Sequence, residues 1–287
     1  MSSATTAPAR FRIPSGMHLV NKLCGAWTLL VFIFLYLPIL LLVAYSFNQS
    51  DMGVAWTGFT FDWYHKLWED ETLKDTLKNS VIIASVTTVL SVFLGTIGAW
   101  LLYRYQFPFL KTLGTLIFIP MVIPEVIMGV SLLIFFTVVC GPLNAWLASF
   151  SEVDAGLGYT TIIIAHTTFC FPFVLVAVQA RLAGVDPFLE EAAMDLGAPP
   201  LKAFWLVMVP YLLPAIISGA LMSFTLSLDE YIVTLFTTGP ESQTLTLKVF
   251  GMAKKGLDPS LNAISTVFIL ATVVLVVLSE AVRKINR

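Results

Sequence analysis

The stretch that decides the fold is Ser80–Tyr103, SVIIASVTTVLSVFLGTIGAWLLY, which contains no charged side chain. A bilayer core about 30 Å thick requires about 20 apolar residues in a helix, so this stretch predicts a helix that crosses a membrane. Five further stretches are long and apolar enough to do the same: Gly25–Phe47, Thr112–Cys140, Tyr159–Ala180, Pro210–Phe236 and Leu261–Val282. They lack the alternation of barrel strands. The sequence therefore predicts an all-α integral membrane protein with six transmembrane helices.

The composition supports a membrane protein and excludes several other classes. Hydrophobic residues make up 57% of the 287 residues and charged residues 12%, against roughly a quarter charged in soluble domains. A soluble enzyme and a disordered chain do not fit these values, and a net charge of −2 argues against a nucleic-acid partner. The cysteines Cys24, Cys140 and Cys170 lie in or beside apolar runs without metal-ligand spacing. We expect no disulfide, metal or cofactor.

The chain is expected to form one membrane domain with short tails. The predicted parts are an N-terminal tail (1–24), the six-helix domain (25–282) and a C-terminal tail (283–287). Lysines and arginines favour the cytoplasmic loops, and placing both termini in the cytoplasm puts every arginine on the inner side: Arg10, Arg12, Arg104, Arg181, Arg283 and Arg287. The largest external segment is then Asn48–Asn79, which is aromatic and acidic. It is either an interfacial cap or a surface on which a partner docks.

The loop 181–209 between the fourth and fifth predicted helices has the pattern of a short helix of its own. Asp186 can cap a helix that begins at Pro187, and Gly197 suits a left-handed residue at its end. Apolar residues recur at helical spacing in this segment: Phe188, Leu189, Ala192, Ala193 and Leu196. The acids Glu190, Glu191 and Asp195 are predicted on the opposite face. Anionic lipid would repel such a face, so we expect a protein partner with basic or mixed charge.

Part of this loop resembles a motif of a known transporter family. Glu191-Ala192-Ala193, Gly197 and the later Val207-x-Val209-Pro210 are similar to the EAA loop of ABC-importer permeases, although Ile and Leu are more usual at the two valine positions. The resemblance implies that the short helix is a coupling helix, which docks on a cytoplasmic ATPase subunit through Glu191, Ala192, Ala193 and Gly197. It also implies the type I importer permease (MetI-like) fold.

The resemblance extends over most of the chain to the permeases of polyamine (spermidine/putrescine) importers. The similar stretches are Tyr45–Asn48, Gly58–Thr60 with Trp63 and Tyr64, Leu102–Tyr105, His166–Pro172, Glu191–Ala198, Ser223–Asp229, Thr238–Pro240 and Asn262–Ala263. The chain looks most like the second of the two permease subunits, the C-type or the putrescine-specific I-type. This implies import of polyamines across the bacterial inner membrane. The implied partners are a second homologous permease, an ATP-binding subunit dimer and a periplasmic polyamine-binding protein.

Three acids lie inside apolar stretches: Glu125, Asp229 and Glu230. A carboxylate in the bilayer costs about 2.5–3.5 kcal/mol even on the lenient insertion scale, so it usually lines a polar path or has a partner. We therefore expect these residues to contact a cationic substrate, near the periplasmic side. Adjacent residues of a helix point about 100° apart, so which of Asp229 and Glu230 faces the pathway stays open. His166, beside two threonines, is expected to be a hydrogen-bonded residue between helices.

The family usually has Asp where this chain has Glu125 and Glu230, which bears on the preference between polyamines. The chain contains no Gly-x-x-x-x-Gly-Lys-Ser/Thr sequence, so the resemblance implies that ATP is hydrolysed on a separate subunit and that this chain is not itself an enzyme. Three alternatives remain: the same kind of permease with another solute, an ion-coupled secondary transporter, and an assembly protein that transports nothing.

Overall fold

The computed structural model describes residues 15–50, 55–105, 108–141, 156–186, 188–255 and 259–285. Over these residues the chain is helical, and the one extended pairing is an isolated antiparallel bridge between Asn48 and Phe59. The predicted all-α class is therefore confirmed for the described part of the chain.

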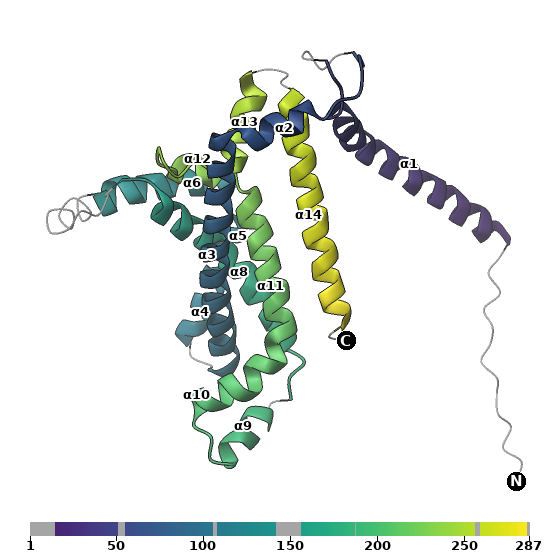
Figure 1. Ribbon diagram of the computed structural model, residues 1–287. Helices are drawn as coiled ribbons and strands as arrows, with labels where there is room; N and C mark the ends of the chain where they lie inside the picture. The colour runs from purple at the N-terminus through teal and green to yellow at the C-terminus, as the bar shows by residue number, and fades with distance from the viewer. Residues whose placement is uncertain are drawn as a thin grey trace, which may run out of the picture.

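Three long helices form the centre of the molecule: α3 (Glu71–Arg104), α8 (Tyr159–Leu182) and α11 (Val209–Asp229), which pack against one another (Figure 1). Small residues allow the close approach, as is common between membrane helices. A Cβ atom at Gly95 would lie 2.8 Å from the Cβ of Val174, and one at Gly219 would lie 3.1 Å from its Cγ1. The buried core at this centre consists of Ala99, Trp100, Val174, Leu175, Val178, Leu182, Val185, Phe204, Met208 and Leu212.

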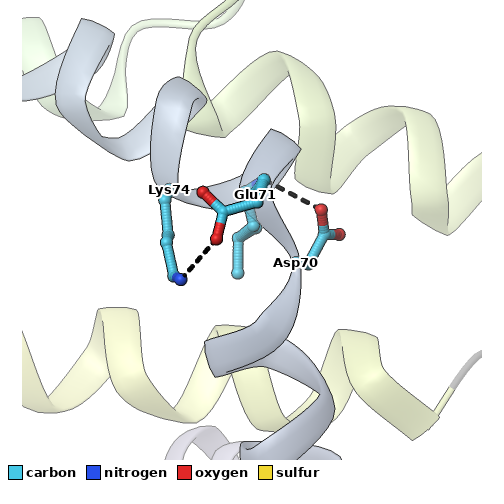
Figure 2. Close-up of polar contacts among 4 residues, drawn as sticks. Asp70, Glu71 and Lys74 are labelled. Carbon is cyan, nitrogen blue, oxygen red and sulfur yellow. Dashed lines mark hydrogen bonds and ion pairs between the residues drawn. The ribbon is translucent and has the colours of Figure 1, made fainter.

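The first of these helices begins with a side-chain cap. The chain turns from α2 (Asp62–Glu69) into α3 at Asp70, whose Oδ1 accepts a hydrogen bond of 3.1 Å from the backbone N–H of Leu73 (Figure 2). In the same turn Lys74 Nζ lies 2.8 Å from Oε1 of Glu71. Both side chains of this pair are exposed, so the ion pair contributes little, and the cap is the stronger determinant of where α3 begins.

Among the described residues, four helices are long and apolar enough to cross a membrane. They are Val20–Tyr45 within α1 (Ser15–Tyr45), then α3, α8 and the continuous run Pro200–Asp229. A fifth span is possible as a pair of helical segments, Pro108–Val122 and Glu125–Val139, which are bent by 108° at the break between them. The last helix, α14 (Pro259–Ile285), contains a shorter apolar helix, Pro259–Val274. The count of six transmembrane helices therefore stays a prediction.

Two of the predicted spans are interrupted. The stretch Thr112–Cys140 begins within α4 (Pro108–Ile117) and contains α5 (Ile119–Val122), α6 (Glu125–Ile134) and the π-helix η1 (Phe135–Val139). Pro124 is extended at the break, with φ −54° and ψ 132°. The stretch Pro210–Phe236 is divided in the same way, because α11 ends at Asp229 and α12 (Ile232–Thr237) follows after Glu230 and Tyr231. Both interruptions lie beside the predicted pathway acids.

The remaining elements cover the two ends of the central helices (Figure 1). At one end lie α9 (Phe188–Asp195), α10 (Pro200–Ala203) and the π-helix η2 (Phe204–Met208), which continues into α11. At the other end lie α2, α6, α12 and α13 (Leu245–Lys255). The first helix begins at Ser15, before the predicted Gly25, and it stands apart from the centre and contacts α14.

Candidate functional site

The three predicted pathway acids line one cavity. Its volume is about 290 Å³, and its walls are Glu125, Asp229, Glu230, Phe169, Leu226, Tyr231 and Ile232. Glu125 begins α6, Asp229 ends α11, and Glu230 lies between α11 and α12. None of the described residues that line the cavity is basic. The cavity therefore presents three carboxylates and two aromatic rings without a positive side chain to balance them.

The interruption after Asp229 explains why both adjacent acids reach the cavity. On a continuous helix they would point about 100° apart, which is why the sequence left open which one faces the pathway. In the structure Glu230 is extended, with φ −68° and ψ 115°, and the helix that follows, α12, packs against α6. Both residues consequently line the same cavity as Glu125.

The two acids of this pair differ in burial and in hydrogen bonding. Glu230 is 7% exposed, and its Oε1 accepts a hydrogen bond of 2.8 Å from the backbone N–H of Val233. Its carbonyl oxygen accepts another of 2.9 Å from Oγ1 of Thr234. Glu230 thus holds the start of α12, whereas the side chains of Asp229 and Glu125 are exposed. These two are the more accessible acids of the cavity.

His166 is the interhelix residue that the sequence predicted. It is buried on α8, and its Nδ1 and Nε2 lie 2.8 Å from Ser227 Oγ and from Thr234 Oγ1 respectively. These hydroxyls belong to α11 and α12, so the imidazole connects three helices behind the acidic cavity. It is not among the residues that line the cavity, which agrees with a structural role.

At the opposite end, the local geometry predicted for the short loop helix is present. Asp186 Oδ1 accepts a hydrogen bond of 3.0 Å from the N–H of Phe188, and Gly197 has a positive φ of 91°. The N–H of Ala198 reaches back to the carbonyl of Ala193 at 3.1 Å, which closes the C-terminal turn. The predicted first residue, Pro187, lies outside the described residues.

The motif residues of this helix face outward for the most part. Glu191, Ala192 and Gly197 are exposed, and Ala193 is half-buried. The prediction that Glu190 shares an outward polar face is wrong, because Glu190 is 3% exposed. It lies beside Trp100 and Arg104 at the end of α3. Helical periodicity separates two faces but does not say which one turns inward, and no sequence signal paired Glu190 with a residue of α3.

The external segment Asn48–Asn79 is partly packed and partly open. Asn48 is buried and holds the first part of the segment together, since its Nδ2 donates to the carbonyl of Ala55 at 2.8 Å and its Oδ1 accepts the N–H of Thr57 at 3.0 Å. Trp63 donates its indole N–H to the carbonyl of Asn48 at 2.8 Å. Trp68, in contrast, is 78% exposed. Neither predicted role of this segment, interfacial cap or docking surface, is decided by this arrangement.

Comparison with known proteins identifies the family. The family described as "Binding-protein-dependent transport system inner membrane component" matches residues 91–286. The chain belongs to this family of inner membrane permeases.

Several curated proteins resemble the permease over most of its length. It is 37% identical to the "Spermidine/putrescine transport system permease protein PotC" of Haemophilus influenzae, over 91% of this chain and 96% of that one. It is 41% identical to the "Putrescine transport system permease protein PotI" of Escherichia coli K12, over 84% and 83% of the two chains. The resemblance to polyamine-importer permeases read from the sequence motifs is confirmed.

Solved structures show that the fold is that of ABC-importer permeases. A bacterial importer of the acidic polysaccharide alginate aligns with a TM-score of 0.73 at 16% identity, covering 93% of this permease and 95% of that chain. The methionine transporter MetNI aligns with a TM-score of 0.55 at 19% identity, covering 76% and 99%. At these identities the likeness concerns the fold alone, and it confirms the predicted fold class.

Proposed function

We propose that this permease translocates polyamines, spermidine or putrescine, into the cytoplasm. The observation that carries the proposal is the cavity in which Glu125, Asp229 and Glu230 meet without a basic residue among the described lining. A linear polycation needs anionic or aromatic partners once it loses water, and this cavity offers both. The names of the relatives PotC and PotI support the same substrate class.

A second cavity supports a path along α11 toward the opposite end. It measures about 300 Å³ and shares Leu226 with the acidic cavity. Ser218, Met222 and Thr225 line it, all on the helix face that Asp229 continues. No charged residue is among its described lining residues. A cation would thus bind first at the acids and then meet a comparatively neutral surface, from which release is easy.

ATP hydrolysis is assigned to a partner, with α9 as the coupling helix. The membrane potential favours entry of a cation by about 2.3 kcal/mol per charge per 100 mV, and accumulation beyond that requires another energy source. The exposed Glu191 and Ala192, the half-buried Ala193 and the exposed Gly197 would contact the ATPase subunit. The proposed assembly contains a second homologous permease, an ATP-binding subunit dimer and a periplasmic polyamine-binding protein.

The proposed orientation places both termini in the cytoplasm, with the acidic cavity toward the periplasm. A reporter fused after Arg287 should then read cytoplasmic, and one inserted near Glu241 should read external. The opposite pattern would place α9 on the wrong side for an ATPase contact and would overturn the orientation.

Purification with the associated subunits tests the transport proposal directly. The complex is reconstituted into proteoliposomes with the binding protein, and uptake of labelled spermidine and stimulation of ATP hydrolysis are measured. We expect both activities, and we expect unlabelled putrescine to compete where thiamine or a phosphonate does not. A carrier that purifies without a nucleotide-binding subunit would contradict the ATP-driven mechanism, and competition by another solute alone would contradict the polyamine assignment.

A further inference from the structure

Glu190 gives α9 a contact with the transmembrane helices that the proposed ATPase docking does not use. Its side chain is buried, whereas the apolar Phe188 and Leu196 of the same helix are 69% and 90% exposed. A surface helix normally turns its apolar side chains toward its own protein and its charges outward. An ionised carboxylate is unfavourable in the interior unless it is paired or hydrogen-bonded, so its neighbours define what it does.

Those neighbours lie on the last turn of α3. Glu190 Oε1 is 3.7 Å from Nε of Arg104, and Oε2 accepts a long hydrogen bond of 3.4 Å from the indole N–H of Trp100. The indole ring in turn packs against Phe204, with the ring centroids 4.6 Å apart. Phe204 begins η2, which leads into α11. One side chain of α9 therefore touches the end of α3 directly and the start of the α11 run through Trp100.

The pair between Glu190 and Arg104 is incompletely formed in this structure. A separation of 3.7 Å is longer than a hydrogen bond, and Oε1 is buried without a hydrogen-bond partner among the described residues. The two side chains border a cavity of about 150 Å³, whose other lining residues are Tyr103, Val185, Asp186, Glu191 and Met208. This space allows Arg104 and Glu190 to approach each other, so a small displacement of α9 changes how strongly the pair interacts.

We propose that Glu190 is a positioning residue that ties α9 to α3, so that a movement imposed on α9 is transmitted through Arg104 to the transmembrane helices. The inference rests on the proposed role of α9 as the coupling helix. Glu191 and Gly197 would hold the ATPase subunit on the outer side of α9, and Glu190 holds α3 on the inner side. The two contacts divide the helix into a docking face and a tethering face.

The test uses the complete transporter with its ATPase and permease partners. Glu190→Gln and Arg104→Gln each remove one charge, and the double variant Glu190→Arg with Arg104→Glu exchanges them. Glu241→Gln, which makes the same substitution at an exposed glutamate between α12 and α13, is the matched control. The readouts are polyamine-stimulated ATP hydrolysis, retention of the ATPase subunit, and the ATP-dependent change in distance between spin labels at the exposed positions Phe93 on α3 and Asp195 on α9.

We expect each single variant to lower stimulated hydrolysis at least about 10-fold and to reduce the distance change, while the ATPase subunit stays bound. The exchanged pair should recover a large part of both, and Glu241→Gln should match the unchanged protein. Stimulation at the unchanged level in both single variants would overturn the proposal, as would reduced stimulation with a full distance change. If polyamines fail to stimulate the unchanged transporter but the distance change still depends on Glu190, the substrate assignment fails and the tether stands.

Discussion

Two glutamates are buried at opposite ends of this permease, and they differ in whether a basic side chain lies beside them. Glu230 lies with two exposed acids and no basic residue among the described lining of its cavity, and a backbone N–H satisfies one of its oxygens. Glu190 has a basic residue of its own chain beside it, at 3.7 Å, and one oxygen without a hydrogen bond. The first site has no basic side chain among its described lining residues, so a positive partner for it would be a ligand. The second already contains its cation and lacks only a closer contact.

This contrast teaches that buried charge alone does not identify a substrate site. An acid compensated within the chain restrains the relative position of two elements, whereas an uncompensated cluster favours a mobile positive ligand. The following variants test whether one end binds the cation and the other couples α9 to the transmembrane helices, beginning with the largest expected effect.

The largest effect is expected at the outward face of α9. Gly197→Asp forces a side chain onto a backbone with φ 91°, a conformation that costs a non-glycine residue about 1–3 kcal/mol. It also adds a negative charge to the proposed ATPase contact. Uptake should fall at least about 100-fold while the protein stays in the membrane, and Glu191→Lys should act likewise. The control is Gly251→Asp, which also has open space around it and no positive φ; equal uptake by the two aspartate variants would refute the coupling role.

A smaller effect is expected when the two exposed acids of the outer cavity are neutralised. Asp229→Asn and Glu125→Gln should each raise the apparent KM for polyamine about 5-fold, equivalent to about 1 kcal/mol for a solvated charge contact. The double variant should raise it more than either alone. Asp62→Asn, an exposed acid on α2, serves as control. ATPase assembly should be unchanged in all of them. Wild-type KM values in both single variants would mean that the acids are structural.

Glu230 allows its charge to be separated from its hydrogen bond. Glu230→Gln keeps an oxygen for the N–H of Val233 and removes the charge, so the KM should rise with little loss of thermal stability. Glu230→Leu removes both, and the unsatisfied buried N–H should cost about 1–3 kcal/mol. Thermal unfolding in detergent, measured together with uptake kinetics, distinguishes the two variants. A Leu variant as stable as the Gln variant would show that the hydrogen bond from Val233 to Glu230 contributes little to stability.

The smallest effect on transport is expected at His166. His166→Phe leaves the hydroxyls of Ser227 and Thr234 without their imidazole partner, which should destabilise the protein by about 1–3 kcal/mol. The KM for polyamine should remain the same, because His166 is outside the acidic cavity. A selective change in KM without a change in stability would place the histidine in the pathway instead.

The sequence predicted the elements whose signals are local. The uncharged run Ser80–Tyr103 lies within α3, and Asp186 and Gly197 bound α9 with the expected cap and positive φ. Each of these depends on residues a few positions apart, so a single sequence contains the necessary information. The family followed from spaced motifs for the same reason.

The interruptions and the orientation of α9 could not be read in this way. Pro120 and Pro124 precede the break before Glu125, but the direction of the chain beyond it depends on α12 packing against α6. Neither Pro nor Gly stands at the break after Asp229. The inward turn of Glu190 depends on Trp100 and Arg104, which are distant in sequence. Tertiary contacts decided each of these features.

The contacts of Val174 with Gly95 and Gly219 bear on how the molecule changes shape. Interiors packed this tightly resist compression, so α3, α8 and α11 should behave as one stiff block. A displacement of α9 would then be transmitted to the far end of the block, because the block itself would deform little. Two helix interruptions among the described residues, at Pro124 and at Glu230, are places where the chain can bend. Glu125, which follows the first interruption, and Glu230 both line the acidic cavity, so we expect the walls of this cavity to move when the block tilts.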